Sequence, residues 1–113
     1  MSVESKIDSA LLSFGYPVKA DYYDGAETTY FVFNHNDIPD DWGDDKPHLD
    51  KNLIQIHLFH PHGWNSVTLR KQVKQALAQA GFSWPSLTDA AEESSAHWVF
   101  ETDNLEAVDY GSV

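Results

Sequence analysis

The stretch KNLIQIHLFH, residues 51–60, decides much of the fold. Ile54, Ile56 and Leu58 alternate with polar or aromatic residues, and a period of two is typical of a strand that buries one face. Pro61 ends this pattern, because proline cannot supply an N–H group to a strand pair. The stretch therefore predicts a β-strand with one apolar face and one mixed face.

Immediately after this strand, the apolar period changes from two to that of an α-helix. Asn65 or Ser66 can cap the start of the helix, and Gly81 is a natural stop. The apolar face consists of Leu69, Val73, Ala76, Leu77 and Ala80. The pattern predicts a helix that packs this face against the sheet, with Leu69 and Leu77 in the core.

The rest of the chain predicts one more helix and three more strands. The N-terminal helix spans residues 3–14 with an apolar period of 3.6 and ends at Gly15. Residues rich in β-branched and aromatic side chains predict strands over 28–33 and 96–102, and a short strand is expected over 18–22. The predicted fold class is α+β: an antiparallel β-sheet of three to five strands with two α-helices packed on one face.

One domain is expected to span residues 1–113, with residues 103–113 as a frayed tail. Because both helices cover the same face, the other face is predicted to be a subunit interface. The apolar residues expected on this other face are Phe31, Phe33, Phe59, Trp98 and Val99.

Composition narrows the function classes. Eighteen acidic residues against seven basic ones give a formal net charge of −11. Such a charge opposes nucleic-acid binding, which depends on neutralising phosphates with Lys and Arg. The absence of cysteine excludes disulfides and thiolate chemistry. No run approaches the ~20 apolar residues of a membrane span, and residues 1–12 are too charged for a signal peptide.

Residues 34–50 are predicted to form a long acidic loop. They contain two prolines, one glycine and six aspartates, without any periodicity. The aspartates are Asp37, Asp40, Asp41, Asp44, Asp45 and Asp50. A solvated, mobile charge run is the favoured interpretation, because the residue order of a calcium loop is missing. Trp42 and Trp64 lie in polar segments and are either partner contacts or loop packing, whereas Trp84 is expected to pack internally.

Three histidines, His57, His60 and His62, form a cluster that resembles a metal site. Imidazoles bind zinc, nickel or copper, but the strand period places His57 and His60 on opposite faces. The cluster is therefore expected to bind no metal. We find no nucleophile–base–orienter arrangement and no phosphate-binding glycine motif, so neither catalysis nor a cofactor is expected.

The overall pattern resembles the tail terminator, or tail completion, proteins of long-tailed phages and prophages. The resemblance covers most of the chain and depends on loose motifs. They are GYPV (15–18), YxxGxExxYFVF (22–33), IQIHL (54–58), KQxKxALxxAGF (71–82) and ExxxxHWVFE (92–101).

The resemblance implies a structural subunit, with no catalytic residues. Such subunits form a ring, often hexameric, at the head-proximal end of the tail, where they contact the tail-tube protein and the head connector. The implied location is the host bacterial cytoplasm during assembly and then the virion tail. The candidate partner-binding residues are Asp40, Asp41, Trp42, Asp44, Asp45, Trp64, Arg70, Lys71 and Lys74. The alternative is an acidic inhibitor that mimics DNA, which the positive side chains of the second helix fit poorly.

Overall fold

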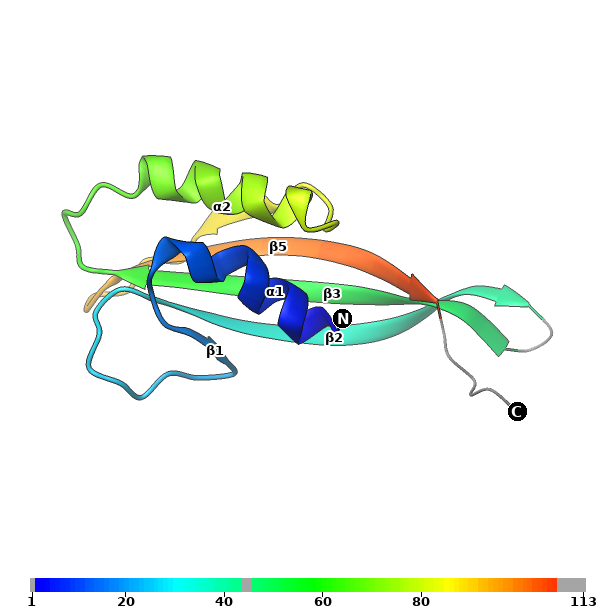
Figure 1. Ribbon diagram of the computed structural model, residues 1–113. Helices are drawn as coiled ribbons and strands as arrows, with labels where there is room; N and C mark the ends of the chain where they lie inside the picture. Colours follow the sequence, from blue (N-terminus) through cyan, green and yellow to red (C-terminus); the bar gives the residue numbers. More distant parts are fainter. Residues whose placement is uncertain (1, 44–45, 108–113) are drawn as a thin grey trace.

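Five strands form one sheet in the order β1-β2-β3-β5-β4 in the computed structural model, which describes residues 2–43 and 46–107 (Figure 1). All neighbouring strands are antiparallel except β1 and β2, which are parallel. The elements are α1 (Val3–Leu11), the 3-10 turn η1 (Leu12–Phe14), β1 (Val18–Ala20), β2 (Tyr30–Gly43), β3 (Lys46–His60), α2 (Val67–Gln79), β4 (Ser86–Asp89) and β5 (Ala96–Ala107). The predicted α+β class is confirmed, although β1 makes the sheet mixed.

Both helices begin and end where the sequence predicts. The Ser2 hydroxyl caps α1 by accepting a hydrogen bond from the Ser5 N–H at 3.1 Å. Gly15 and Gly81 follow the helical segments with φ angles of 83° and 99°. Only glycine adopts this left-handed conformation without strain, so both positions are efficient helix stops.

The core lies between the two helices and one face of the sheet. The helices contribute Val3, Ile7, Leu11, Val73 and Leu77, and the sheet contributes Phe31, Phe33, Ile54, Ile56, Leu58 and Phe100. Leu77 is fully buried, as predicted, and Leu69 packs against the core while remaining half-buried. We call the sheet face under the helices the covered face and the opposite one the open face.

The strand register corrects the predicted distribution of apolar side chains between the two faces. Phe31 pairs with Leu58, and Leu58 pairs with Trp98, so all three side chains point to the covered face. Phe33 also lies there, in the core. The open face is accordingly less apolar than the sequence suggested.

The predicted acidic loop is wrong. Residues 34–43 continue β2 and residues 46–50 belong to β3, and the two strands stay paired as far as Gly43 and Lys46. We call the distal part of the sheet, residues 37–43, 46–52 and 103–107, the β-arm. In Figure 1 it extends beyond both helices, and the molecule measures 53 × 25 × 24 Å.

Two prolines, Pro39 and Pro47, led the sequence pattern to predict a loop instead of these strands. β1 pairs with β2 only as far as Phe33, and β5 pairs with β3 only from Leu49. Pro39 and Pro47 therefore each have one strand edge without a partner strand in the described ranges. A missing N–H group is tolerated at such an edge.

Two further elements differ from the predictions. β5 continues to Ala107, so residues 103–107 are paired with β3 instead of frayed, and residues 108–113 lie outside the described residues. Residues 86–89 form β4, a strand that was not predicted, which pairs with the outer edge of β5.

Candidate functional site

The open face is the surface most suited to a function, because both helices of the described part of the chain lie on the covered face (Figure 1). The alternation of β2, β3 and β5 presents twelve side chains on it. They are Tyr30, Val32, Asn34, Asn36, Leu53, Gln55, His57, Phe59, His97, Val99, Glu101 and Asp103. Aromatic rings and histidines occupy one end, and amides and carboxylates occupy the end that leads to the β-arm.

Four rings form a continuous stack across the open face, which we call the aromatic ladder. The ring centroids of Tyr23 and Tyr30 lie 4.5 Å apart, those of Tyr30 and Phe59 5.0 Å, and those of Phe59 and His97 4.1 Å. Tyr30, Phe59 and His97 stack because the strand register places them side by side. The ladder thus connects the three long strands to the segment between β1 and β2.

That segment folds back over the sheet. Asp21 adopts a φ of 69° and its N–H donates to the Phe33 carbonyl at 2.9 Å, which ends the pairing of β1. The Tyr23 hydroxyl then accepts a hydrogen bond from the Glu27 N–H at 3.0 Å. Between this segment and the ladder lies an open cavity of about 330 Å³, which His57 also lines.

His57 and His97 form a direct pair beside the ladder. His57 Nδ1 lies 2.7 Å from His97 Nε2, a hydrogen-bond distance. Asn34 Nδ2 approaches the other nitrogen of His57 at 3.5 Å, and Glu92 Oε1 lies 3.6 Å from His97 Nδ1. Burial, followed by the neighbouring His97, lowers the pKa of His57 from its ordinary value of 6.5, and Glu101 opposes this shift.

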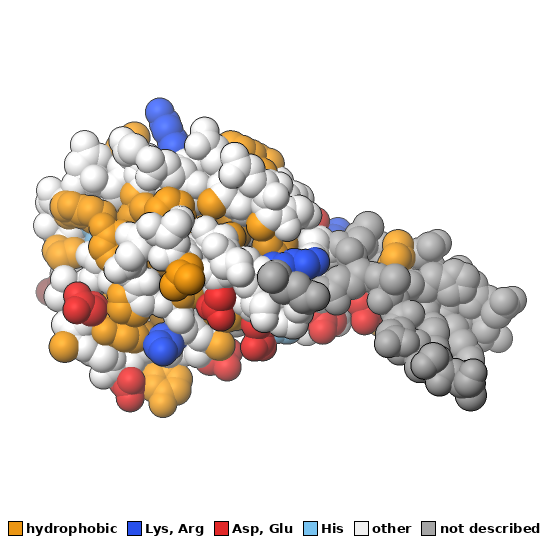
Figure 2. All heavy atoms as spheres, in the orientation of Figure 1, with side chains coloured by type: hydrophobic (Ala, Val, Ile, Leu, Met, Phe, Trp, Pro, Cys, Tyr) orange, Lys and Arg blue, Asp and Glu red, His pale blue; other side chains and the backbone are white. Residues whose placement is uncertain are grey.

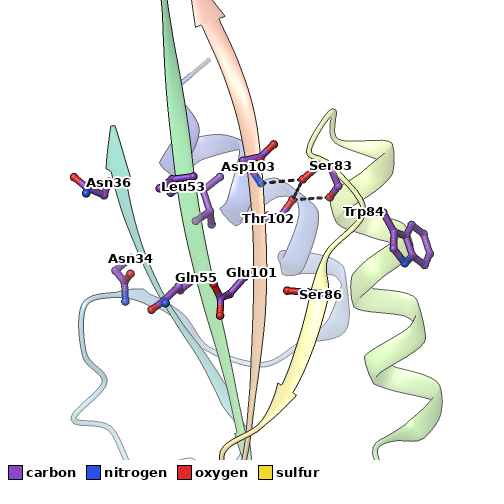
Figure 3. Close-up of a pocket in the computed structure, with 11 residues that line it drawn as sticks. Asn34, Asn36, Leu53, Gln55, Ser83, Trp84, Ser86, Glu101, Thr102 and Asp103 are labelled. Carbon is purple, nitrogen blue, oxygen red and sulfur yellow. Dashed lines mark hydrogen bonds between the residues drawn. The ribbon is translucent and has the colours of Figure 1, made fainter. Parts of the chain in front are cut away.

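A second, shallow groove of about 580 Å³ lies at the polar end of the open face (Figure 3). Gln55 and Glu101 are directly paired across β3 and β5 in its floor. Ser83 forms one wall, held by its hydroxyl, which accepts a hydrogen bond from the Asp103 N–H at 3.0 Å. Trp84 points away from the floor and is 62% exposed, so the prediction that it packs internally is wrong.

The three positive side chains of α2 that were predicted to bind a partner do not all face outward. The Arg70 guanidinium lies 3.8 Å from the centroid of the Trp98 ring, and Arg70 Nε donates to the Ser66 hydroxyl at 2.9 Å. Lys74 is half-buried and Lys71 is exposed. On the face seen in Figure 2, Lys and Arg side chains appear as separate spots instead of a patch.

The remaining predicted partner residues have varied surroundings. Trp64 is 41% exposed, and its ring lies edge-on to Tyr16 and His60, so it combines loop packing with an accessible surface. The backbones of Asp40, Asp41 and Trp42 belong to β2. Residues 44–45 lie outside the described residues.

The histidine cluster is divided between the two faces, as the strand period predicts. His60 is buried on the covered face, where its Nε2 accepts a hydrogen bond from Trp98 Nε1 at 3.1 Å. His62 Nε2 donates to the Glu92 carbonyl at 2.8 Å. Within residues 2–43 and 46–107, no three potential metal ligands converge, and no helix is long and apolar enough to span a membrane.

The contact between His57 and His97 was not predicted from the sequence. The alternation of side chains along each strand does place His57 and Phe59 on one face of β3, and His97 on one face of β5. His57 and His97 are 40 positions apart in the sequence, and only the register between β3 and β5 brings them into contact.

Comparison with known proteins identifies a fold and no family. No protein-family model matches the chain, and no curated protein matches it significantly. Solved structures do resemble it: one, of a protein whose name states no function, has a TM-score of 0.61 and 12% sequence identity over 97% of this chain and 96% of its own. At that identity, the similarity establishes a shared α+β fold alone.

Proposed function

We propose that this chain is a structural subunit of a phage or prophage tail, in the tail terminator or head–tail joining class. It acts through protein–protein contacts in a ring, with the tail-tube protein and the head connector as its partners. The sequence motifs described above support this class. The observation that carries the proposal is the β-arm.

The β-arm extends past the helices that cover the rest of the sheet. The core beneath those helices ends near two buried side chains: Asn52, where the arm begins on β3, and Thr102, just before it begins on β5. On the arm itself, Ile38 is 43% exposed and Asp37 is also exposed. A paired extension that adds little to the core offers its surface and edges to other chains.

Charge determines which surfaces the arm can approach. β2 carries three aspartates within the arm, at positions 37, 40 and 41, against no lysine or arginine. Such a strand favours a basic surface on a neighbouring subunit or on the tail. Lys71 is exposed and can supply such a contact, whereas Arg70 is held over Trp98 and cannot.

A variant with a shortened arm tests this proposal. The variant joins Ile38 to Lys51 through Asn-Gly, which removes residues 39–50 at a position where the two flanking residues are already paired. Because the core lies outside the deleted segment, we expect the variant to keep its circular dichroism spectrum and to unfold cooperatively. Tails made with this variant should lose uniform length or fail to join heads in electron micrographs.

The matched control is Gln79→Ala, an exposed change at the end of α2 and far from the arm in sequence, which should leave tails normal. The proposal fails if a complete deletion of the gene still yields tails of uniform length that carry heads. If the deletion affects tails and the shortened arm does not, the tail assignment stands and the role of the arm is wrong.

An acidic DNA mimic is the second candidate. One observation favours it: Arg70 turns inward, so the positive stripe that opposed this interpretation is smaller than the sequence predicts. Neighbouring genes separate the two candidates. Capsid, connector and tail-tube genes favour the tail protein, and an isolated gene beside a restriction system favours the mimic.

A further inference from the structure

We propose that the His57–His97 pair is a proton-operated switch in the open face, which stays joined when it carries one added proton and separates when it takes up a second. The inference depends on the geometry of the pair and is independent of the proposed function.

The neighbours of the pair select its tautomers. The Asn34 amide group faces His57 Nε2 and the Glu92 carboxylate faces His97 Nδ1. In the neutral pair, His57 Nε2 therefore accepts, and His97 Nδ1 carries the proton that faces Glu92. The remaining proton of His57 is on Nδ1, which donates to His97 Nε2 at 2.7 Å. All three contacts are satisfied by one arrangement of protons.

A count of protons shows why two added charges are not tolerated. The first added proton can bind His57 Nε2 when the Asn34 amide turns to present its oxygen, and the bridge between the rings remains a single hydrogen bond. A second added proton makes both rings imidazolium, so both bridging nitrogens carry hydrogen. Two N–H groups cannot face each other at 2.7 Å, so the rings must move apart.

The charged groups around the pair come from four segments. Glu101 lies on β5, and Glu92 lies on the connection between β4 and β5. Asp21 lines the same cavity from the segment after β1. Lys19 is on β1, where its partner Val32 is in turn paired with His57. Three carboxylates against one lysine favour the first positive charge, whereas burial of His57 and the mutual repulsion of the rings oppose the second.

Tyrosines 22, 23 and 30 also line the cavity, and Asp103 lies at the other end of the same face.

Separation of the pair is transmitted to the aromatic ladder. His97 is the end of the ladder and stacks on Phe59 at 4.1 Å, and Phe59 continues the stack to Tyr30 and Tyr23. A displaced, charged His97 ring loses this stacking and brings positive charge to the aromatic end of the open face. Acidification therefore changes the surface that the open face presents to a partner.

The direction of the effect on stability follows from the lowered pKa of His57. In the unfolded chain the pKa of His57 has its ordinary value of 6.5, so the unfolded chain binds a proton at this residue more readily than the folded chain does. The pair therefore stabilises the fold fully above pH 6.5, and this stabilisation is lost as the pH falls through the folded-state pKa.

NMR titration of the histidine rings tests the switch. We expect two steps for the pair in the wild-type chain, with the second at least about one pH unit below the first, as for strongly coupled sites. The ring signals of Phe59, Tyr30 and Tyr23 should shift with the second step and stay constant during the first.

Three variants complete the test. In His97→Gln the remaining His57 should titrate in one step, and the acid-dependent shifts of Phe59 and Tyr30 should disappear. His57→Gln serves if the first variant does not fold: it should also reduce the two steps to one, and the ladder should shift with that single step because His97 still stacks on Phe59. His35→Gln is the control, because His35 lies on the covered face between Glu4 and Asp37 and should leave both steps intact. Independent single titrations of His57 and His97 in the wild type, or a second step without ladder shifts, would overturn the proposal.

Discussion

Arg70 occupies a position on α2 where sequence periodicity indicates solvent, yet its side chain is part of the packing between α2 and the sheet. Its guanidinium covers the Trp98 ring, while the indole N–H of Trp98 donates to His60 and Arg70 Nε donates to Ser66. Arginine can do this because its long apolar stem and planar head pack well against an aromatic face.

We expect Arg70→Ala to lower the free energy of unfolding by about 1 kcal/mol, the usual range for a partly exposed cation–π contact with its packing. Lys71→Ala, one residue along and exposed, should change it by less than about 0.5 kcal/mol. Urea denaturation measures both values. Equal effects of the two substitutions would show that the contact with Trp98 contributes nothing to stability.

Leu77 is expected to be among the most sensitive positions of the core. It is fully buried in the core, so Leu77→Ala should cost about 2–5 kcal/mol. Leu12 provides the matched control, because the same substitution there truncates a side chain that is 72% exposed. A loss below about 0.5 kcal/mol at Leu77 would contradict its placement in the core.

At the scale of elements, the β2–β3 pair is the main feature that local sequence did not indicate. Its distal half contains proline, glycine and aspartate, all of which are depleted in strands. The strands form there because they continue the register of a proximal half that is anchored by Phe33, Ile54 and Ile56. Local propensity is thus overridden by pairing that begins in the core.

Amide hydrogen exchange should reveal this pairing. β3 has a neighbour on both sides from Leu49 to Phe59, so consecutive amides there should be protected. Among residues 2–43 and 46–107, β3 is the sole neighbour of β2 from Asn34 to Ile38, so protection should alternate with a period of two. Uniformly fast exchange over residues 34–38 would instead support the mobile loop that the sequence predicted.

At the scale of the whole molecule, shape and charge act in opposite directions. The elongated sheet offers an open face and a projecting arm, both suited to contacts with other chains. The formal net charge of −11 opposes the approach of identical subunits. Any ring of this protein therefore depends on screening or on a basic partner.

Self-association of the purified chain should accordingly increase with salt. The electrostatic screening length falls from about 30 Å at 0.01 M ionic strength to about 3 Å at 1 M, and this removes the repulsion between subunits. Sedimentation velocity at rising protein and salt concentrations measures the effect. The shortened-arm variant lacks five aspartates and one lysine, so its association should depend less on salt. Stronger association at low salt would show that attractive ion pairs dominate the contact.

Strands and helix ends that depend on short segments could be predicted from the sequence alone. Alternating Ile54, Ile56 and Leu58 specified a strand and its buried face, and Gly15 and Gly81 specified where helical segments stop. These features depend on side-chain period and on backbone conformations open to glycine, both of which are readable within about ten residues.

Only the tertiary structure decided the β-arm, the inward position of Arg70 and the pairing of His57 with His97. Each depends on the register between strands or on the packing of a helix over the sheet, and brings together residues far apart in the chain. A shift of one residue in a strand moves every side chain to the other face, so these contacts are set by the core as a whole and cannot be read from any segment alone.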